Sequence, residues 1–204
     1  MSQLKLLHSG GNGVSIVAPD SNPASDRTLK LPSDVNSTID TVNRAGNILQ
    51  VVSFTKTNAA SASITQDTNW TGHGVAVNIT PSSASNKIII SGYITVGNDR
   101  NDGIFGIAYK NGSPLTAAIG DQGTGASMTR ATTAVEIDYA FVVTPIPIYF
   151  IDTAGSTSQQ TYTMALNITT NASSTVYVNR PQTSDNYVWN ATTISVLTAM
   201  EVAA

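Results

Sequence analysis

The chain offers few side chains that could act as nucleophiles, bases or metal ligands. It contains no cysteine, and its two histidines are His8 and His73. A Ser-His-Asp triad would need His73 with an aspartate distant in sequence, and no Gly-x-Ser-x-Gly motif accompanies it. A zinc site would need carboxylates to complete its ligand set. We interpret the histidines as an arm residue and a loop residue, and we expect no catalysis, no metal and no cofactor.

Two carboxylates are the best candidates for acid–base chemistry. Glu136 and Asp138 stand two residues apart, so on a strand they would project from the same face. A pair of this kind could serve in glycoside hydrolysis. In a threonine-rich strand the same spacing is more typical of a solvated face, and we prefer that interpretation.

Two polar segments have part of a ligand-binding motif. In Asn98-Asp-Arg-Asn-Asp-Gly103, Arg100 falls on the third position of a calcium loop, and no glutamate closes the loop. The glycine-rich segment Gly120-Asp-Gln-Gly-Thr-Gly125 is followed neither by a lysine nor by a helix, as a phosphate-binding loop would require. We predict a polar turn at the first segment and a mobile loop at the second.

The remaining candidates for function are surface contacts. Tyr187 and Trp189, with Tyr177 nearby in sequence, form the main aromatic cluster. Aromatic side chains stack on sugars or anchor interfaces, and the alternative is that Trp189 closes one end of a sandwich. The candidate contact residues are Asn98, Asp99, Arg100, Asn101, Asp102, Tyr187 and Trp189.

Strands must position these residues, because apolar and polar residues alternate strictly through the last three-quarters of the chain. In residues 161–169, one side carries Tyr162, Met164, Leu166 and Ile168, and the other carries Thr161, Thr163, Asn167 and Thr169. Period two places one face on a core and the other in water. The strand candidates are residues 48–56, 63–68, 75–80, 87–96, 104–110, 115–119, 134–143, 146–152, 162–169, 175–179 and 193–202. This pattern predicts an all-β fold, an antiparallel β-sandwich resembling a jelly roll.

Turn residues refine this prediction. The segment Lys110-Asn-Gly-Ser113 predicts a tight hairpin, because Asn-Gly readily supplies two positive φ angles. Pro145 and Pro147 have no backbone donor, so residues 144–148 are expected at a sheet edge or at a crossing between sheets.

Residues 1–45 differ from the rest. Short strand-like runs at 4–7, 14–18 and 27–32 are separated by glycine and proline turns, and three such runs cannot bury a core alone. Residues 34–44 have helical spacing, with Asp34 as N-cap and Gly46 as stop. We predict an N-terminal arm over residues 1–45, for docking or for intertwining in a trimer, and a β-sandwich knob over residues 46–204. The arm residues expected to dock on a particle are Leu4, Leu6, Leu7, Val14, Ile16, Val17, Leu29 and Leu31.

Composition narrows the class of function. Charged residues make up 11% of the 204 residues, and the formal net charge is −3. The ten lysines and arginines are scattered, which disfavours nucleic-acid binding. No apolar stretch reaches the roughly 18 residues of a membrane span, and no signal peptide is recognisable. We therefore expect the chain to fold in a cytoplasm unless a separate machinery exports it. A neutral surface rich in Thr, Ser and Asn favours a structural or adhesive module over an enzyme.

Three segments resemble a module of tailed-phage structural proteins. They are Gly46-Asn-Ile-Leu-Gln-Val-Val52, Ile79-Thr-Pro-Ser-Ser-Ala-Ser-Asn-Lys-Ile-Ile-Ile90 and Thr193-Ile-Ser-Val-Leu-Thr-Ala-Met-Glu-Val202. The module occurs in tail-fibre-like and virion-surface proteins of cyanobacterial and marine phages, and residues 14–32 are similar to a segment that often precedes it. The resemblance implies a homotrimeric, non-enzymatic virion protein. Typical fibres carry a longer anchoring domain or shaft than residues 1–45 provide.

The combined expectation is a trimeric tail fibre or knob with a role in host attachment. The first alternative is a capsid decoration (cement) protein that stabilises the shell, and the second is a carbohydrate-binding or carbohydrate-degrading domain. The expected partners are sister copies, other virion proteins and a host surface glycan, with no nucleic acid and no membrane insertion. The expected location is the virion, assembled in the host cytoplasm.

Overall fold

The computed structural model describes residues 3–7, 9–11, 13–17, 45–100, 102–121, 128–137, 139, 141–170, 172–183 and 190–204. Residues 3–7 and 13–17 are described as backbone. The chain divides into two compact units, Met1–Asp40 and Thr41–Ala204, and each is described here by itself. The strand-like run at 27–32 and the helix predicted over 34–44 lie outside the described residues.

The first unit contains an antiparallel hairpin. Strand β1 (Gln3–Leu7) pairs with β2 (Gly13–Val17), so that Gln3 lies opposite Val17 and Leu7 opposite Gly13. Gly11, in the connecting turn, has a φ of 93°, which glycine adopts without the steric cost that other residues meet. Two of the three short runs predicted in the arm are therefore strands.

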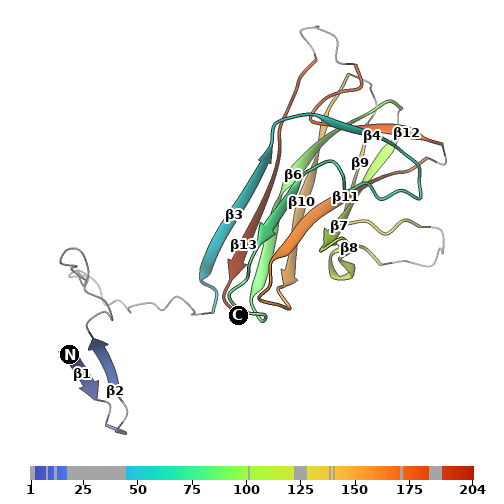
Figure 1. Cartoon of the computed structure of the whole chain (residues 1–204). Helices are drawn as coiled ribbons and strands as arrows, with labels where there is room; N and C mark the ends of the chain where they lie inside the picture. The colour runs from blue at the N-terminus through green and yellow to red at the C-terminus, as the bar shows by residue number, and fades with distance from the viewer. Residues whose placement is uncertain are drawn as a thin grey trace. The chain divides into compact units, whose positions relative to one another are not determined.

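The second unit consists of two antiparallel sheets packed face to face (Figure 1). The first sheet is formed by β3 (Ile48–Lys56), β4 (Ala60–Ile64), β6 (Lys87–Asn98), β10 (Thr144–Thr153), β12 (Ser174–Val178) and β13 (Ser195–Val202). Its order is β3-β13-β6-β12-β4, and β10 pairs along the other side of β6. The second sheet is formed by β5 (Ala76–Ile79), β7 (Gly103–Lys110), β8 (Ser113–Pro114), β9 (Thr133–Glu136) and β11 (Gln160–Ile168). Its order is β5-β11-β7-β8, with β9 beside β7. The predicted antiparallel β-sandwich is confirmed.

Alternating apolar residues of the two sheets form the core between them. Ile88, Ile90 and Ile94 on β6 are fully buried, as are Met164 and Leu166 on β11. β-Branched side chains suit this position because they have few rotamers and pack closely on a pleated surface. Burying each such side chain stabilises the fold by about 1.5–3 kcal/mol.

One face of the second sheet departs from the predicted alternation. Asn167 on β11 was expected in water but is buried, and Ala165 on the same side is buried as well. Ala165 packs in a small apolar cluster together with Ile119 and Ala131, which belong to the connection between β8 and β9. The Gly120 amide donates to the Ala131 carbonyl at 2.9 Å, which closes this connection over the sheet. A loop, rather than solvent, therefore covers this part of β11.

Three strand predictions need correction. Residues 115–119 form no strand and instead contain the short 3-10 helix η1 (Thr116–Ala118), where the Ala118 amide donates to the Leu115 carbonyl at 2.9 Å. The strand predicted at 63–68 ends at Ile64, because Thr65 and Thr68 close a turn. The strand predicted at 134–143 ends at Glu136.

The predictions based on turn residues are confirmed. Strands β7 and β8 are joined through Asn111 and Gly112, whose φ angles are 51° and 81°. Strand β10, which contains Pro145 and Pro147, lies at a sheet edge: among the described residues it pairs with β6 alone.

Candidate functional site

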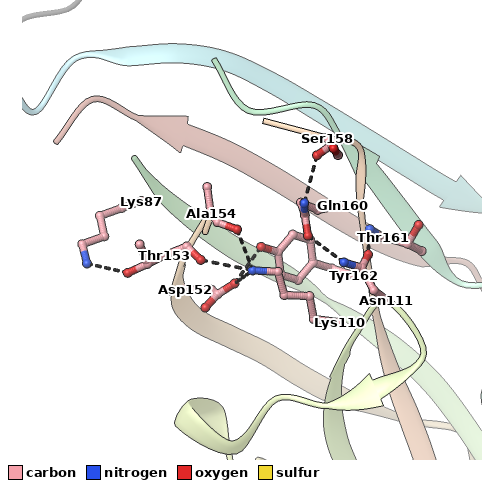
Figure 2. Close-up of polar contacts among 10 residues, drawn as sticks. All are labelled: Lys87, Lys110, Asn111, Asp152, Thr153, Ala154, Ser158, Gln160, Thr161 and Tyr162. Carbon is pink, nitrogen blue, oxygen red and sulfur yellow. Dashed lines mark hydrogen bonds and ion pairs between the residues drawn. The ribbon is translucent and has the colours of Figure 1, made fainter. Parts of the chain in front are cut away.

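One ion pair joins the two sheets at an end of the sandwich (Figure 2). Lys110 ends β7 and Tyr162 lies on β11, both in the second sheet, whereas Asp152 lies on β10 of the first sheet. The Nζ atom of Lys110 is 2.6 Å from Oδ2 of Asp152. The Tyr162 hydroxyl donates to the same carboxylate oxygen at 2.8 Å. These three side chains therefore fasten one sheet to the other.

The contacts of Lys110 use all three protons of its ammonium group. Besides Asp152, Nζ donates to the carbonyl oxygens of Thr153 at 3.1 Å and Ala154 at 2.9 Å. It also lies 5.6 Å from the centroid of the Tyr162 ring, in a cation–π contact. Burial, and then the hydrogen bond and negative charge of Asp152, raise the pKa of Tyr162 well above its usual value. The tyrosine keeps its proton at neutral pH, so this cluster has the chemistry of a structural link rather than of a base or nucleophile.

Amide side chains fix the neighbouring turns. Nδ2 of Asn111 donates to Oε1 of Gln160 at 2.7 Å, and the Thr161 amide donates to Oδ1 of Asn111 at 2.8 Å (Figure 2). Gln160 in turn donates to the Ser158 carbonyl at 2.9 Å. The β7–β8 turn is thereby held against the start of β11.

Glu201 is a second buried polar centre, on the core-facing side of β13. Its Oε1 accepts hydrogen bonds from the Ser82 amide at 2.7 Å, the Ser82 hydroxyl at 2.8 Å and Nδ2 of Asn86 at 2.7 Å. Its Oε2 accepts from Nε2 of Gln50 at 2.5 Å. Burial alone would raise the pKa of this carboxyl group, but the hydrogen bonds outweigh it and lower the pKa of Glu201 to about 2. The carboxylate ties the loop between β5 and β6 to β13.

His73 lies between β4 and β5 and is buried, with 1% of its surface exposed. The Val75 amide donates to Nδ1 at 3.1 Å, so the proton of the neutral ring is on Nε2, which donates to the Met164 carbonyl at 2.7 Å. Burial is the main cause that lowers the pKa of His73 to about 4, and the charge of Lys56 adds to it against the opposing effect of the Met164 carbonyl. Both nitrogens are thus used by the backbone. His73 occupies a loop as predicted, but it is an interior residue there.

The predicted contact loop after β6 is only partly on the surface. Asn98 is 1% exposed, and its Oδ1 accepts a hydrogen bond from the Arg100 amide at 2.9 Å. Asp99 accepts from the Ser174 hydroxyl at 2.8 Å. Arg100 is exposed and lies 3.4 Å from Asp102. The prediction of Asn98 as a surface contact is therefore wrong, because its amide supports the loop from within. A binding role for Arg100 and Asp102 stays a prediction.

Other predicted site residues are not brought together by the described structure. Outside the described residues lie His8, Leu29, Leu31, Asn101, Asp138, Tyr187, Trp189 and residues 122–127 of the glycine-rich loop. On the backbone of β1 and β2 lie Leu4, Leu6, Leu7, Val14, Ile16 and Val17. Glu136 is exposed at the end of β9, so the Glu136–Asp138 pair stays a hypothesis.

The part of the chain that the structure describes contains neither a cluster of metal ligands nor a membrane-spanning helix. No group of three or more His, Cys, Asp or Glu side chains there could hold a metal ion. The same part contains no helix with the length and hydropathy needed to cross a membrane.

The outward side of the first sheet carries an open groove that sequence reasoning missed. The groove has a volume of about 880 Å³ and is lined mainly by apolar atoms. Tyr93 and Thr95 of β6 lie between Pro145 and Pro147 of β10 and Ile194, which precedes β13. Alternation in residues 87–96 indicated which side chains turn away from the core. It could not indicate that prolines of a strand 50 residues later would flank them.

Comparison with known proteins adds little to this geometry. No family model and no curated protein matches the sequence. A solved structure of infectious bursal disease virus, Gx strain, covers 94% of this chain at 13% identity, with a TM-score of 0.34. A structure of the Gt strain covers 95% at 15% identity, with a TM-score of 0.39. The chain spans 48% of the length of each of these chains. Similarities of this size do not indicate a function for this chain.

Proposed function

We propose that the chain is a non-enzymatic structural protein of a tailed-phage virion, a homotrimer on the particle surface that acts as a tail fibre or knob in host attachment. The resemblance of three segments to phage structural modules suggests the class. Composition supports it, since charged residues make up 11% of the chain and cysteine is lacking.

The observation that carries the proposal is that buried polar side chains link separate parts of the fold to one another. Lys110 and Asp152 link the two sheets, Glu201 ties a loop to β13, and His73 bridges two backbone segments. Each of these groups forms hydrogen bonds to another part of the fold. A sandwich braced in this way suits mechanical and binding work, in which shape is kept rather than changed.

The number of copies on the particle tests the virion role. Quantitative mass spectrometry of purified particles of the virus that encodes the chain should detect it at a few dozen copies at most, as a fibre requires. Several hundred copies per particle would instead identify a capsid decoration protein. Absence from purified particles would overturn the virion role altogether.

A carbohydrate assay tests the non-enzymatic part of the proposal. Purified protein incubated with host polysaccharide should bind it saturably without releasing reducing ends. Release that increases with protein concentration, and that is lost in Glu136→Gln or Asp138→Asn variants, would establish a carbohydrate-degrading enzyme instead.

A further inference from the structure

We infer that copies of this chain meet through the outward face of the first sheet. This outer face consists of the side chains of β10, β6, β13 and β3 that point away from the core, and the structure describes all four strands. The inference rests on the homotrimer in the proposed function, and it adds the surface that forms the trimer.

Strand register places apolar residues in one row across the outer face. Ile151 of β10 lies opposite Ile89 of β6, and Ile89 lies opposite Met200 of β13. Met200 in turn lies opposite Val51 of β3. Adjacent strands are about 4.8 Å apart, so the row runs for roughly 14 Å without a polar side chain. Side chains paired in this way contact one another and form a continuous apolar stripe.

Exposure is highest at the two lateral strands of the outer face. On β10, Tyr149 is 68% exposed and Ile151 is 50% exposed. On β3, at the opposite side, Ile48 is 59% exposed and Val51 is 58% exposed. Figure 1 shows β3 and β13 on the side of the sandwich away from β7 and β8, where no described strand of this unit covers them.

The outer face is almost free of charge. Lys87 is the one charged residue among the outward-pointing side chains of these four strands, and its Nζ donates to the Thr153 hydroxyl at 2.8 Å, at one end of the face. The other outward-pointing residues are apolar residues, glycine, serine or threonine. A charged partner would lose hydration here without gaining an opposite charge. A neutral, apolar partner matches the face, and a second copy presents such a surface.

The size of the outer face suits an interface. Four strands about 4.8 Å apart and about eight residues long, at about 3.4 Å per residue, cover a plan area of roughly 500 Å². The accessible area of protruding side chains exceeds their plan area, and the groove beside Tyr93 enlarges it further. A stable interface buries about 800 Å² per partner, so the outer face has an area of the right order.

The arrangement fits a threefold axis. A closed ring requires two different, complementary patches on each copy. The β10 side and the β3 side of the outer face are different patches that both expose large apolar side chains, so in the inferred trimer the β10 side of one copy packs against the β3 side of the next. Ile89 and Met200, between them, then face the axis. Pro145 and Pro147 have no backbone donor, which disfavours strand addition at the β10 edge and leaves face-to-face packing.

Charge variants of the full-length chain test this surface. Val51→Lys and Ile151→Lys leave the new charge in water in a monomer but would bury it in the trimer. Light scattering at micromolar concentration should give about three times 21.3 kDa for the wild type and about 21.3 kDa for each variant. Circular dichroism should show that both variants keep the wild-type fold. Ser113→Lys, on exposed strand β8, is the matched control and should stay trimeric.

A charge pair tests the threefold packing. In the double variant Val51→Lys/Ile151→Glu, opposite charges from neighbouring copies would meet, so the trimer should return. A double variant that stays monomeric overturns the pairing of the β10 side with the β3 side. If Val51→Lys and Ile151→Lys each remain trimeric, the outer face is not the interface. That result would not affect the proposed virion role. A monomeric wild type overturns the homotrimer and this inference together, whereas the copy-number measurement can still support a virion protein.

Discussion

Protonation of His73 would disrupt two features of the interior at once. A proton on Nδ1 removes the acceptor of the Val75 amide, and the new charge would lie in the interior close to Lys56. The same residue in the unfolded chain takes up its proton at the ordinary pKa of 6.5. The unfolded state therefore binds more protons than the native state between about pH 6.5 and about pH 4.

The native state should consequently lose stability as the pH falls through this window. A pKa lowered from 6.5 to about 4 corresponds to roughly 2–3 kcal/mol of unfolding free energy lost between pH 7 and pH 4.5. Urea unfolding at the two pH values measures the loss. A His73→Gln variant should show a much smaller change, and an equal change would contradict the assignment. Glu201 acts with the same sign at lower pH, between its ordinary 4.5 and about 2, so its effect falls mainly below this range.

The ion pair between Lys110 and Asp152 should stabilise the fold more than an exposed ion pair does. Lys110→Met leaves the Asp152 carboxylate largely buried with the Tyr162 hydroxyl as its remaining partner, and should cost about 3 kcal/mol of unfolding free energy. The double variant with Asp152→Leu should cost clearly less than the sum of the two single changes. Chemical unfolding in a double-mutant cycle measures this coupling.

Arg100→Met is the control for that cycle. Its guanidinium lies 3.4 Å from Asp102, but the side chain is 51% exposed, so the change should cost less than about 1 kcal/mol. Similar losses of unfolding free energy for Arg100→Met and Lys110→Met would show that the link between the sheets stabilises the fold no more than an exposed ion pair does.

At the scale of the elements, β11 shows how packing modifies a strand. Its core-facing side follows the alternation, with Met164, Leu166 and Ile168 fully buried. On its other side Asn167 is also buried, donating from Nδ2 to Oδ1 of Asn69 at 2.8 Å and accepting from the Ile168 amide at 2.6 Å. Thr161 and Thr163 keep the partly exposed setting that the pattern predicted for this side, and Thr169, directly after the strand, is exposed.

Substitutions on β11 should therefore separate its two sides. Leu166→Asp places an unpaired charge in the core and should prevent folding or cost more than about 4 kcal/mol. Thr163→Asp loses the 2.6 Å hydrogen bond to the Val75 carbonyl and should cost about 1–2 kcal/mol. Thermal unfolding of both variants checks the order, and equal losses would contradict the register of β11.

At the scale of the whole molecule, the division of the chain predicts separable roles. The sandwich unit, Thr41–Ala204, closes on itself, since the Gly46 amide donates to the Ala203 carbonyl at 2.9 Å and the Ala203 amide donates to the Asn47 carbonyl at 2.9 Å. Its first strand, β3, and its last strand, β13, are thus joined by residues of this unit itself.

Deletion of residues 1–30 should leave the sandwich folded while incorporation into particles is lost. The midpoint of thermal unfolding should change by no more than a few degrees, because the core residues that the structure describes all belong to the second unit. Complementation of a virus lacking the gene, followed by immunoblotting of purified particles, measures incorporation. Normal incorporation of the deletion variant would place particle docking on the sandwich instead of the arm.

Sequence by itself determined the features that depend on local period and turn chemistry. Alternation predicted the all-β class and most strands, and Asn111-Gly112 predicted the hairpin. The two prolines of β10 predicted an edge or a crossing between sheets, and the strand lies at an edge. These features depend on residues a few positions apart, whose backbone preferences are set locally.

Tertiary structure alone decided which distant residues meet. Lys110 reaches Asp152, and Met200 lies beside Ile89, through strand pairing and sheet packing between segments far apart in the chain. The burial of Asn167 and His73 depends on what covers them, which no local pattern encodes. Alternation predicts that a side chain points away from the core. Only the register between strands decides which of these side chains lie next to one another on the surface.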